Sequence, residues 1–478
     1  MLLLPLSPSV RAEAPPLPMP GDENHAAIDE MPEQRSERMR WWRDAKFGMF
    51  IHWGLYSGLA GEFKGQQGGA EWIQKNLELN TEEYAQEALP LFTPRAEAAE
   101  EWALLAREAG CRYAVLTSKH HEGFALFDTK TSDFNVKKTK GVDMVRAYVD
   151  AMRAQGVKVG FYHSVIDWHH PEYDFTINPD LAYPKGQQMM LESRAMPRNQ
   201  AAYQNYLHEQ VRELLSNYGP VDVIWWDYSQ DAAEGKRAWN APALIEMCRR
   251  LQPGIIMNNR LYSYSGLKAD GNVVSLDLRC GDFMTPEQRI PEAGYPGVDW
   301  ESCMTVGDKW GYNRYDTRYK SAETLIRRLV ECTAKGGNLL LNINPTATGQ
   351  VPAPVAEALR GVGAWLRVCG EAIYATRTVP GLHLPEGCYA TQKDGIIYVF
   401  LPPAAANDDG LPTDYELKLD AEEIGAVSAQ LLGMERRAVS QREEYGNADN
   451  LRTTSVFTIP AEAWKALDVP VLKLICEI

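Results

Sequence analysis

The sequence predicts a parallel (β/α)8-like TIM barrel followed by a C-terminal antiparallel β-sandwich. A chain of 478 residues with 45% hydrophobic content is too long for a single hydrophobic core, because single cores stop growing near ~250–300 residues. We therefore expect two domains. Within residues 31–374, a unit of helix, glycine, apolar strand and polar strand end recurs, which is typical of a parallel sheet with alternating helices. From residue 375 to 478, short strands separated by Pro, Gly and Asn-Asp indicate a separate sandwich.

The clearest unit ends at Asp227. Residues 198–218 carry apolar side chains at helical spacing and are followed by Gly219, a residue suited to a left-handed helix cap. The run GPVDVIWWDY then predicts a buried strand that ends in a carboxylate. In a parallel barrel, the loops after the strands meet over one face, where active sites form. Asp227 is therefore a candidate catalytic residue, and the competing interpretation is a carboxylate that only caps the next loop.

The other elements follow from the same periodicities, taken in chain order. Further helices are expected where apolar residues recur at helical spacing, at 31–45, 97–109, 143–155, 242–251, 322–334 and 352–368. Further barrel strands are expected at the apolar runs 47–54, 113–121, 157–164, 255–260, 273–278 and 338–345. Sandwich strands are expected at 396–401, 414–419, 454–459 and 471–476.

The net charge of the chain restricts the classes of binding partner that we expect. The net charge is −15 and the sequence pI is near 5.2. Nucleic acids and anionic membrane surfaces both select basic patches, so neither is an expected partner. A neutral substrate fits this composition better. No segment approaches ~18 uninterrupted apolar residues, so we expect no transmembrane span.

The first residues, MLLLPLSPSVRAEAPP, combine a short apolar stretch with a small-residue AEA site. They lack the positive start and the length of a full signal peptide. We expect residues 1–30 to be a leader with the remnant of a secretory signal, or a mis-set start, and a secreted or periplasmic location. The eight cysteines are scattered without a CxxC pair, which predicts buried free thiols.

Histidines gather at the ends of the first three expected strands. Six of the nine histidines lie there: His52, His120, His121, His163, His169 and His170. A metal site would join such histidines to carboxylates. A sugar pocket would instead use imidazoles and carboxylates to bind hydroxyl groups, with aromatic rings covering the apolar face of the sugar.

Two features favour the sugar pocket over the metal site. Metal-dependent hydrolase barrels usually open with a His-x-His pair on the first strand, whereas here His52 is followed by Trp53. Tryptophans also stand at strand ends and in loops, at Trp53, Trp72, Trp225, Trp226 and Trp310. We therefore expect no metal and no other cofactor.

A series of segments occurs in order between about residues 39 and 370: KFGMFIHWGLYS, EWI, LTSKHHEGFALFDTKTSDFNV, DVIWWDY, GDFMTPE, WGYN and GGNLLLNINP. Together they resemble the α-L-fucosidases of glycoside hydrolase family 29. The resemblance implies a (β/α)8-like catalytic barrel, a C-terminal β-sandwich and retaining, metal-independent hydrolysis of terminal α-L-fucose by double displacement. The substrate is implied by the resemblance alone.

The resemblance also implies the catalytic pair. The family nucleophile is the Asp that closes the fourth strand, which is Asp227 here. Retaining hydrolysis needs a second carboxyl ~5–5.5 Å away to protonate the leaving oxygen. In bacterial relatives this acid is a Glu in a loop after the sixth strand, which corresponds to Glu287. Two alternatives stay open: Glu287 in the first turn of a helix after Thr285-Pro286, and Glu301 as the acid.

Some relatives carry an Asp proposed for the acid role in an Asn-Asp-Arg context on the fifth strand. This chain reads Asn258-Asn259-Arg260, and an Asn cannot donate that proton. The matching segments imply a sugar pocket formed by His52, Glu71, Trp72, His120, His121, Tyr162, His163, Trp225, Arg260 and Trp310. Which residue of the 162–163 pair faces the sugar is open, and His121 and Arg260 could instead brace a neighbouring residue.

Two functions remain. The leading hypothesis is an exo-acting hydrolase that acts on fucosylated oligosaccharides or glycoconjugates with retention. The alternative is a catalytically impaired carbohydrate-binding relative, which Asp227 argues against and the missing Asn-Asp-Arg acid leaves open. The linkage that is cleaved depends on loops beyond the fucose pocket. A homo-oligomer is left open.

Overall fold

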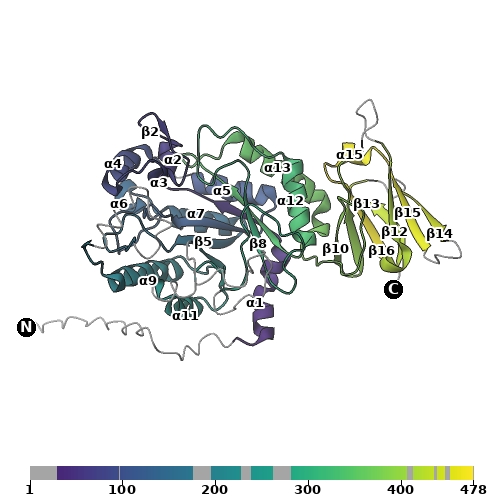
Figure 1. The fold of residues 1–478 in the computed structure, drawn as a ribbon, viewed down its shortest axis with the longest axis horizontal. Helices are drawn as coiled ribbons and strands as arrows, with labels where there is room; N and C mark the ends of the chain where they lie inside the picture. The colour runs from purple at the N-terminus through teal and green to yellow at the C-terminus, as the bar shows by residue number, and fades with distance from the viewer. Residues whose placement is uncertain are drawn as a thin grey trace, which may run out of the picture.

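The computed structural model describes residues 30–95, 97–175, 195–227, 238–261, 281–405, 413–434, 439–446 and 453–476. Its barrel is a curled, seven-stranded parallel sheet in the order β7-β6-β5-β4-β1-β9-β8 (Figure 1). The strands are β1 (Phe47–Ile51), β4 (Tyr113–Lys119), β5 (Lys158–Ser164), β6 (Val223–Asp227), β7 (Ile256–Met257), β8 (Glu301–Thr305) and β9 (Asn338–Ile343). The alternation of helix and strand thus produces the predicted barrel class.

An irregular segment, residues 282–288, lies between β7 and β8 and takes the place of a strand there. Isolated parallel bridges join Asn258 to Phe283 on one side and Glu287 to Cys303 on the other. The backbone N–H of Asn259 donates to the Phe283 carbonyl at 3.1 Å. This segment is not helical, so the first-turn interpretation of Glu287 is wrong. The strand expected at 273–278 lies outside the described residues.

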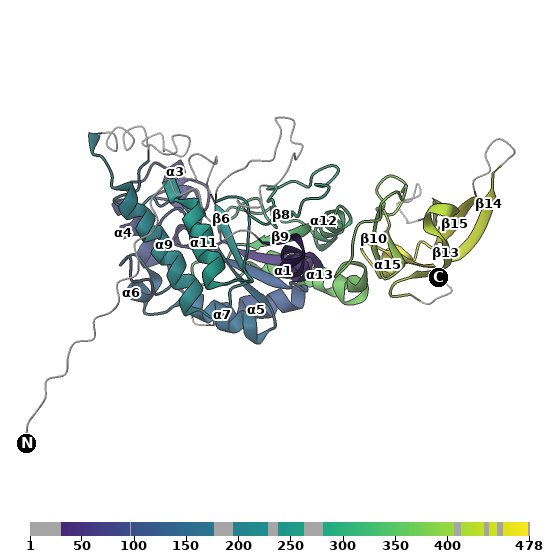
Figure 2. The ribbon, with the colours of Figure 1, turned by 90° about the horizontal axis from the view of Figure 1, so that it is seen from below.

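In the described ranges, eight helices of at least 11 residues accompany the sheet, and α5, α7, α9 and α11 lie along one face of it (Figure 2). They are α1 (Pro32–Ala45), α4 (Thr81–Leu91), α5 (Ala98–Ala109), α7 (Met144–Ala154), α9 (Gln200–Asn217), α11 (Ala241–Leu251), α12 (Ala322–Ala334) and α13 (Ala353–Cys369). Gly110 and Gly219 follow α5 and α9 with positive φ values of 86° and 74°, as the cap prediction required.

Successive side chains on each barrel strand pack into two different layers. Met49 and Ile51 of β1 belong to the large core shared with the helices. Phe50, between them, belongs to a compact cluster inside the curled sheet, together with Tyr162 and Trp225. Because side chains alternate along a strand, residues of this inner cluster form the floor beneath the C-terminal strand ends.

Further elements between β1 and α5 lie at the mouth of the barrel. They are α2 (Tyr56–Leu59), β2 (Glu62–Phe63), β3 (Gln66–Gln67), α3 (Ile73–Asn76) and α4 (Thr81–Leu91), and α6 (Val136–Lys140) follows β4. The buried carboxylate of Glu122, after β4, accepts the backbone N–H of Leu55 at 2.8 Å and that of Tyr56 at 3.3 Å. This contact fastens the loop that follows β1 to the loop that follows β4.

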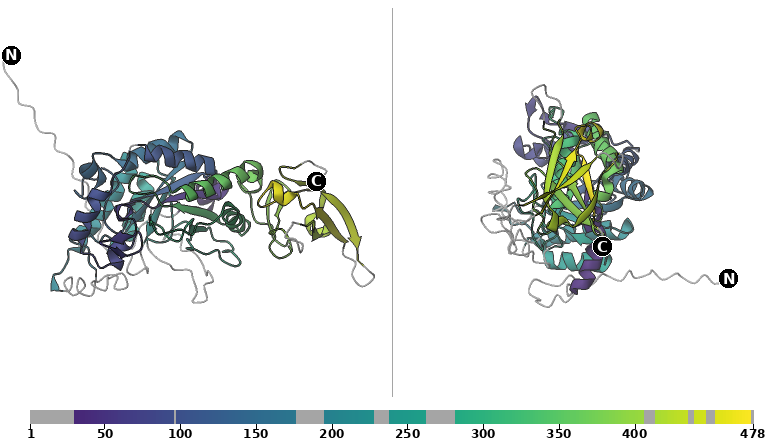
Figure 3. Two further views of the ribbon diagram at one scale, coloured as in Figure 1. Left: turned by 90° about the horizontal axis from the view of Figure 1, so that it is seen from above. Right: turned by 90° about the vertical axis from the view of Figure 1, so that its right-hand side faces the viewer.

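The C-terminal part is an antiparallel β-sandwich beside α12 and α13 (Figure 3). One sheet has the order β10-β11-β16-β13, with β10 (Tyr389–Lys393), β11 (Ile396–Phe400), β16 (Val471–Cys476) and β13 (Ala426–Leu431). The other has the order β12-β15-β14, with β12 (Tyr415–Asp420), β15 (Thr453–Ile459) and β14 (Ser440–Tyr445). The short helices α14 (Ala421–Ile424) and α15 (Ala463–Ala466) complete it, and the 3-10 turn η3 (Gly370–Ala372) follows α13 ahead of it.

Several sequence expectations can be compared with these elements. The strand β8 was not expected, nor were β10, β13 and β14 in the sandwich. Every cysteine whose side chain the structure describes is unpaired and buried, as predicted. Each helix in the described ranges is too short or too polar to cross a bilayer.

Candidate active site

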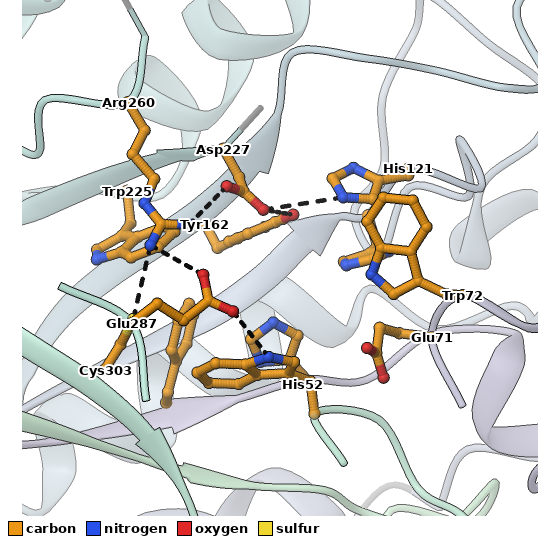
Figure 4. Close-up of a pocket in the computed structure, with 13 residues that line it drawn as sticks. His52, Glu71, Trp72, His121, Tyr162, Trp225, Asp227, Arg260, Glu287 and Cys303 are labelled. Atoms are coloured by element: carbon orange, nitrogen blue, oxygen red, sulfur yellow. Dashed lines mark hydrogen bonds and ion pairs between the residues drawn. The ribbon is translucent and has the colours of Figure 1, made fainter. Parts of the chain in front are cut away.

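A pocket of about 310 Å³ opens at the C-terminal ends of the barrel strands (Figure 4). It brings together segments that are as far apart in the chain as β1 and the loop after β8. Its lining residues are Phe50, His52, Glu71, Trp72, His120, His121, Tyr162, Trp225, Asp227, Arg260, Glu287, Cys303 and Trp310. The volume lies at the small end of ligand pockets, which is the size expected for a single sugar ring.

Asp227 is the last residue of β6 and lies at the centre of the pocket. Its Oδ1 accepts Arg260 Nη1 at 3.0 Å, and its Oδ2 accepts the Tyr162 hydroxyl at 2.9 Å. His121 Nε2 lies 3.8 Å from the same Oδ2. Burial alone raises the pKa of Asp227, but these partners, Arg260 first, outweigh it and hold the pKa below its ordinary value. The carboxylate is therefore ionised and oriented.

Arg260 connects the two carboxylates of the pocket. Its Nη1 contacts Asp227, and its Nη2 donates to Glu287 Oε2 at 3.0 Å. The guanidinium is fixed from behind, because Nε donates to the Thr285 hydroxyl at 2.8 Å and its carbon lies 4.6 Å from the centre of the Trp225 ring. One planar cation thus holds Asp227 and Glu287 on two sides of a small space.

Glu287 occupies the rim of the pocket. Its side chain is 44% exposed, compared with 16% for Asp227. Its second oxygen, Oε1, accepts the Trp310 indole N–H at 3.2 Å. A carboxyl group in this position faces both the interior of the pocket and the solvent.

Three imidazoles form the other side of the pocket. His52 Nδ1 is 2.7 Å from Asn342 Oδ1, and His121 Nδ1 is 2.7 Å from the Ser164 hydroxyl. Burial lowers the pKa of His52 and of His121 to about 4 each, and it holds the pKa of His120 well below its ordinary value. All three rings are therefore neutral near pH 7, and each has hydrogen-bonding capacity suited to hydroxyl groups.

Glu71 and Trp72 follow the β2–β3 hairpin and extend this side. Glu71 Oε2 accepts the backbone N–H of Gly311 at 2.8 Å, which fixes the loop that carries Trp310. Burial raises the pKa of Glu71 above its ordinary value. The Trp72 ring lies edge-on to His121 at 5.1 Å. Aromatic rings and polar groups are thus interleaved around the cavity.

The structure corrects part of the histidine prediction. Tyr162 lines the pocket, whereas His163 does not, because its Nδ1 lies 2.9 Å from the Ser118 hydroxyl in the layer behind the sheet. The backbone N–H groups of His169 and His170 donate to Asp167 Oδ1 at 2.9 Å each, and neither ring lines the pocket. Half of the histidine cluster therefore supports the strand-end loops.

The fifth-strand segment supplies one pocket residue, Arg260. Asn258 is buried, and its side chain exchanges two hydrogen bonds with the backbone of Trp226, at 2.8 and 2.9 Å. Asn259 is also buried, and its Oδ1 is 3.4 Å from the Thr285 hydroxyl. Neither asparagine lines the pocket, and each braces its neighbourhood.

Two lining residues were missed. Phe50 of β1 lies two positions before His52, so once His52 is assigned to the pocket, the two-residue period of a strand places Phe50 on the same side. Cys303 lies on β8, the strand that the sequence did not indicate. The alternative acid, Glu301, is on the same strand but does not line the pocket. Among the described residues, no group of three His, Cys, Asp or Glu side chains is arranged to hold a metal ion.

Comparison with known proteins places these observations in a family. The family model for α-L-fucosidases matches residues 22–371. Human plasma α-L-fucosidase is 31% identical over 416 residues, which cover 82% of this chain and 81% of the human protein. The α-L-fucosidase of Dictyostelium discoideum is 30% identical over 356 residues, covering 70% of this chain and 71% of that protein.

Solved structures agree with the sequence relatives. The α-L-fucosidase isoenzyme 1 of Paenibacillus thiaminolyticus superposes with a TM-score of 0.79 at 34% identity, covering 93% of this chain and all of that one. A family 29 α-L-fucosidase of Bacteroides thetaiotaomicron superposes with a TM-score of 0.74 at 26% identity, covering 92% and 95%. That structure is a covalent intermediate trapped with 2-fluoro-fucosyl fluoride in a glutamate-to-glutamine variant.

Proposed function

This chain belongs to the α-L-fucosidase family, and from its pocket we propose that Asp227 is the nucleophile and Glu287 the acid/base. The reaction is retaining hydrolysis of terminal α-L-fucose from fucosylated glycans through a covalent fucosyl-enzyme. One observation carries the residue assignment. Arg260 contacts both carboxylates at 3.0 Å, and a retaining enzyme requires two carboxyl groups on opposite sides of the reacting carbon.

In the first step, a carboxylate oxygen of Asp227 attacks the anomeric carbon as the bond to the leaving oxygen breaks. Glu287 gives its proton to that oxygen, so the alcohol departs neutral. The ionised state of Asp227 is supported by Arg260, which together with the other partners of this carboxylate outweighs the cost of burial. The partial exposure of Glu287 suits the departure of a large alcohol toward solvent.

In the second step, Glu287 takes a proton from water, and the water oxygen attacks the anomeric carbon. The bond to Asp227 breaks, and fucose leaves with its original anomeric configuration. The carboxylate of Asp227 and the protonated Glu287 are regenerated. Arg260 contacts both groups in the structure, and these contacts limit how far either carboxylate can move.

The other pocket residues are proposed to bind the sugar. His52, His120 and His121 are neutral and buried, so they offer hydrogen bonds to hydroxyl groups without charge. Phe50, Trp72 and Trp310 offer apolar surface to the ring and its methyl group.

The comparisons give no support to a catalytically impaired carbohydrate-binding relative, and the pocket holds both carboxylates. The test is hydrolysis of an aryl α-L-fucoside followed by NMR of the first-formed sugar. Release of α-L-fucose as the initial anomer is the expected result. Absence of turnover by folded protein, or initial release of the inverted anomer, would contradict the assignment.

Three broader points are also proposals. We propose residues 31–374 as the catalytic barrel, 375–478 as the sandwich and 1–30 as a leader. We propose a secreted or periplasmic location, supported by the plasma location in the name of the human relative, and cell fractionation tests it. The acidic charge supports glycan over nucleic acid as a partner, and light scattering on the purified chain tests for a homo-oligomer.

A further inference from the structure

Glu301 is a buried carboxylate for which the proposed reaction has no use. It is the first residue of β8, is 1% exposed and lies one layer below the pocket, because Cys303, two residues later on the same strand, lines it. A carboxylate this deep is costly unless its oxygens are hydrogen-bonded. Both oxygens of Glu301 are: Oε2 accepts the Tyr113 hydroxyl, and Oε1 accepts the indole N–H of Trp225 at 3.2 Å.

Trp225 connects this buried carboxylate to the pocket. Its ring stacks on Tyr162, with ring centres 5.8 Å apart and planes 19° apart, and the Arg260 guanidinium carbon lies 4.6 Å from its ring centre. Tyr162 and Arg260 each hold one oxygen of Asp227, and Arg260 also holds Glu287. The side chains of Tyr162 and Arg260, which orient Asp227, thus both pack against the ring of Trp225.

The hydrogen bond from Trp225 to Glu301 fixes the position of the indole ring. An indole has a single N–H donor, and here it is directed into the barrel, away from the space where a sugar would lie. Packing in the inner cluster confines the ring, and the hydrogen bond adds a directional contact that fixes its N–H edge. The position of this ring sets where Tyr162 and Arg260 can stand.

We infer that Glu301 is a positioning residue for the hydrolysis, acting through Trp225 to place the groups that hold Asp227 and Glu287. This inference rests on the proposed roles of those two carboxylates. It also gives Glu301 a role different from that of the acid, since it does not reach the pocket. Burial raises the pKa of Glu301 to about 7, partly offset by its hydrogen-bond donors, and an oxygen can accept the indole N–H in either protonation state.

The experiment compares four variants. Trp225→Phe keeps an aromatic ring and removes the indole N–H donor, and Glu301→Leu removes the acceptor. Glu301→Gln retains one acceptor oxygen for the indole, because the Tyr113 hydroxyl can turn to accept from the amide. The double variant Trp225→Phe/Glu301→Leu completes a cycle. The matched control is Tyr113→Phe, which removes the Tyr113 hydroxyl that donates to Glu301 and leaves Trp225 untouched.

We expect Trp225→Phe and Glu301→Leu each to lower kcat by ~10- to 100-fold, the loss expected from a small misplacement of reacting groups. The factor should be equal for a dinitrophenyl fucoside and a natural disaccharide, with little change in KM. The double variant should lose no more than either single variant. Glu301→Gln should recover most of the rate, and Tyr113→Phe should stay within about threefold of the starting enzyme. Thermal melting identifies any variant that fails to fold.

Two results would overturn the inference: multiplicative losses in the double variant, or a near-normal kcat for Trp225→Phe beside a large loss for Glu301→Leu. If Glu301→Leu fails to fold, Trp225→Phe and Glu301→Gln still test the inference. A full rate for Trp225→Phe would show that the hydrogen bond from Trp225 to Glu301 does not position the reacting groups. A failure of the proposed function has a different signature. In that case Glu301 variants, rather than Glu287 variants, lose more activity on the poorer leaving group.

Discussion

The two sides of the pocket differ in the charge state of their buried ionisable groups. On the side of β6 to β8, Asp227 and Glu287 share the cation of Arg260, and the pKa of Asp227 ends below its ordinary value despite burial. On the side of β1 and β4, burial lowers the pKa of His52 and His121 to about 4, so those rings are neutral. Figure 4 shows Arg260 and Glu287 across the cavity from His121 and Trp72.

This contrast matches the two tasks of a glycosidase. Charge develops on the sugar only while bonds are exchanged, so ionised groups are useful next to the anomeric carbon. The sugar hydroxyls are neutral in every state, and neutral donors and acceptors bind them without a charge that must be desolvated. Damage to the ionic side should therefore affect turnover, and damage to the neutral side should affect recognition.

The largest effect is expected for Asp227→Ala. Losing the nucleophile should lower kcat by ~10³-fold or more while fucose still binds, because the carboxylate acts mainly after binding. Added azide should restore part of the turnover through the vacated space. Steady-state kinetics and a fucose titration measure both effects. The control is Asp222→Asn, because Asp222 directly precedes the N-terminal end of β6, away from the pocket. A near-normal rate for Asp227→Ala would show that Asp227 is not the nucleophile.

Glu287→Ala should have the next largest effect, and one that depends on the leaving group. A natural disaccharide needs protonation, so it should lose ~10²- to 10⁴-fold, whereas a dinitrophenyl fucoside should lose far less. The alkaline limb of the pH profile should flatten. Glu71→Ala is the control and should lose similar factors on both substrates. Leaving-group dependence in Glu301→Ala instead of Glu287→Ala would reassign the acid.

His121→Phe should lower kcat/KM by ~10- to 100-fold, equally on both substrates, because one hydroxyl contact is lost. The pKa of His121 is lowered to about 4, so the ring is neutral above that pH. The loss should therefore be the same factor at pH 5.5 and at pH 7.5. A factor that changes between these pH values would show a cationic ring. His170→Gln, outside the pocket, is the control and should change the rate little.

The smallest effect is expected from chelation. Exhaustive EDTA treatment should leave the rate unchanged, because the imidazoles are assigned to hydroxyl groups and not to a metal ion. Activity is measured before and after dialysis against the chelator. Loss of activity that one added divalent metal restores would contradict the contrast between the two sides.

The sequence by itself determined the barrel and the positions of most pocket residues. Alternating helices and apolar strands specify a parallel sheet, and parallel strands bring their C-terminal ends to one face. The order of strands and strand ends along the chain is therefore enough to place His52, His121 and Asp227 together. The resemblance to a family added roles for them, and it also identified Glu71 and Trp310 in loops that no periodicity describes.

The tertiary structure alone decided which neighbouring side chains face the pocket. Both faces of a buried parallel strand are apolar, so the alternation that marks the inner face is lost. Tyr162 and His163 could not be separated until the register placed Tyr162 beside Trp225. Glu287 and Glu301 could not be separated either. One lies in a segment that replaces a strand and the other one layer down on β8, and only contacts between distant parts of the chain set that difference.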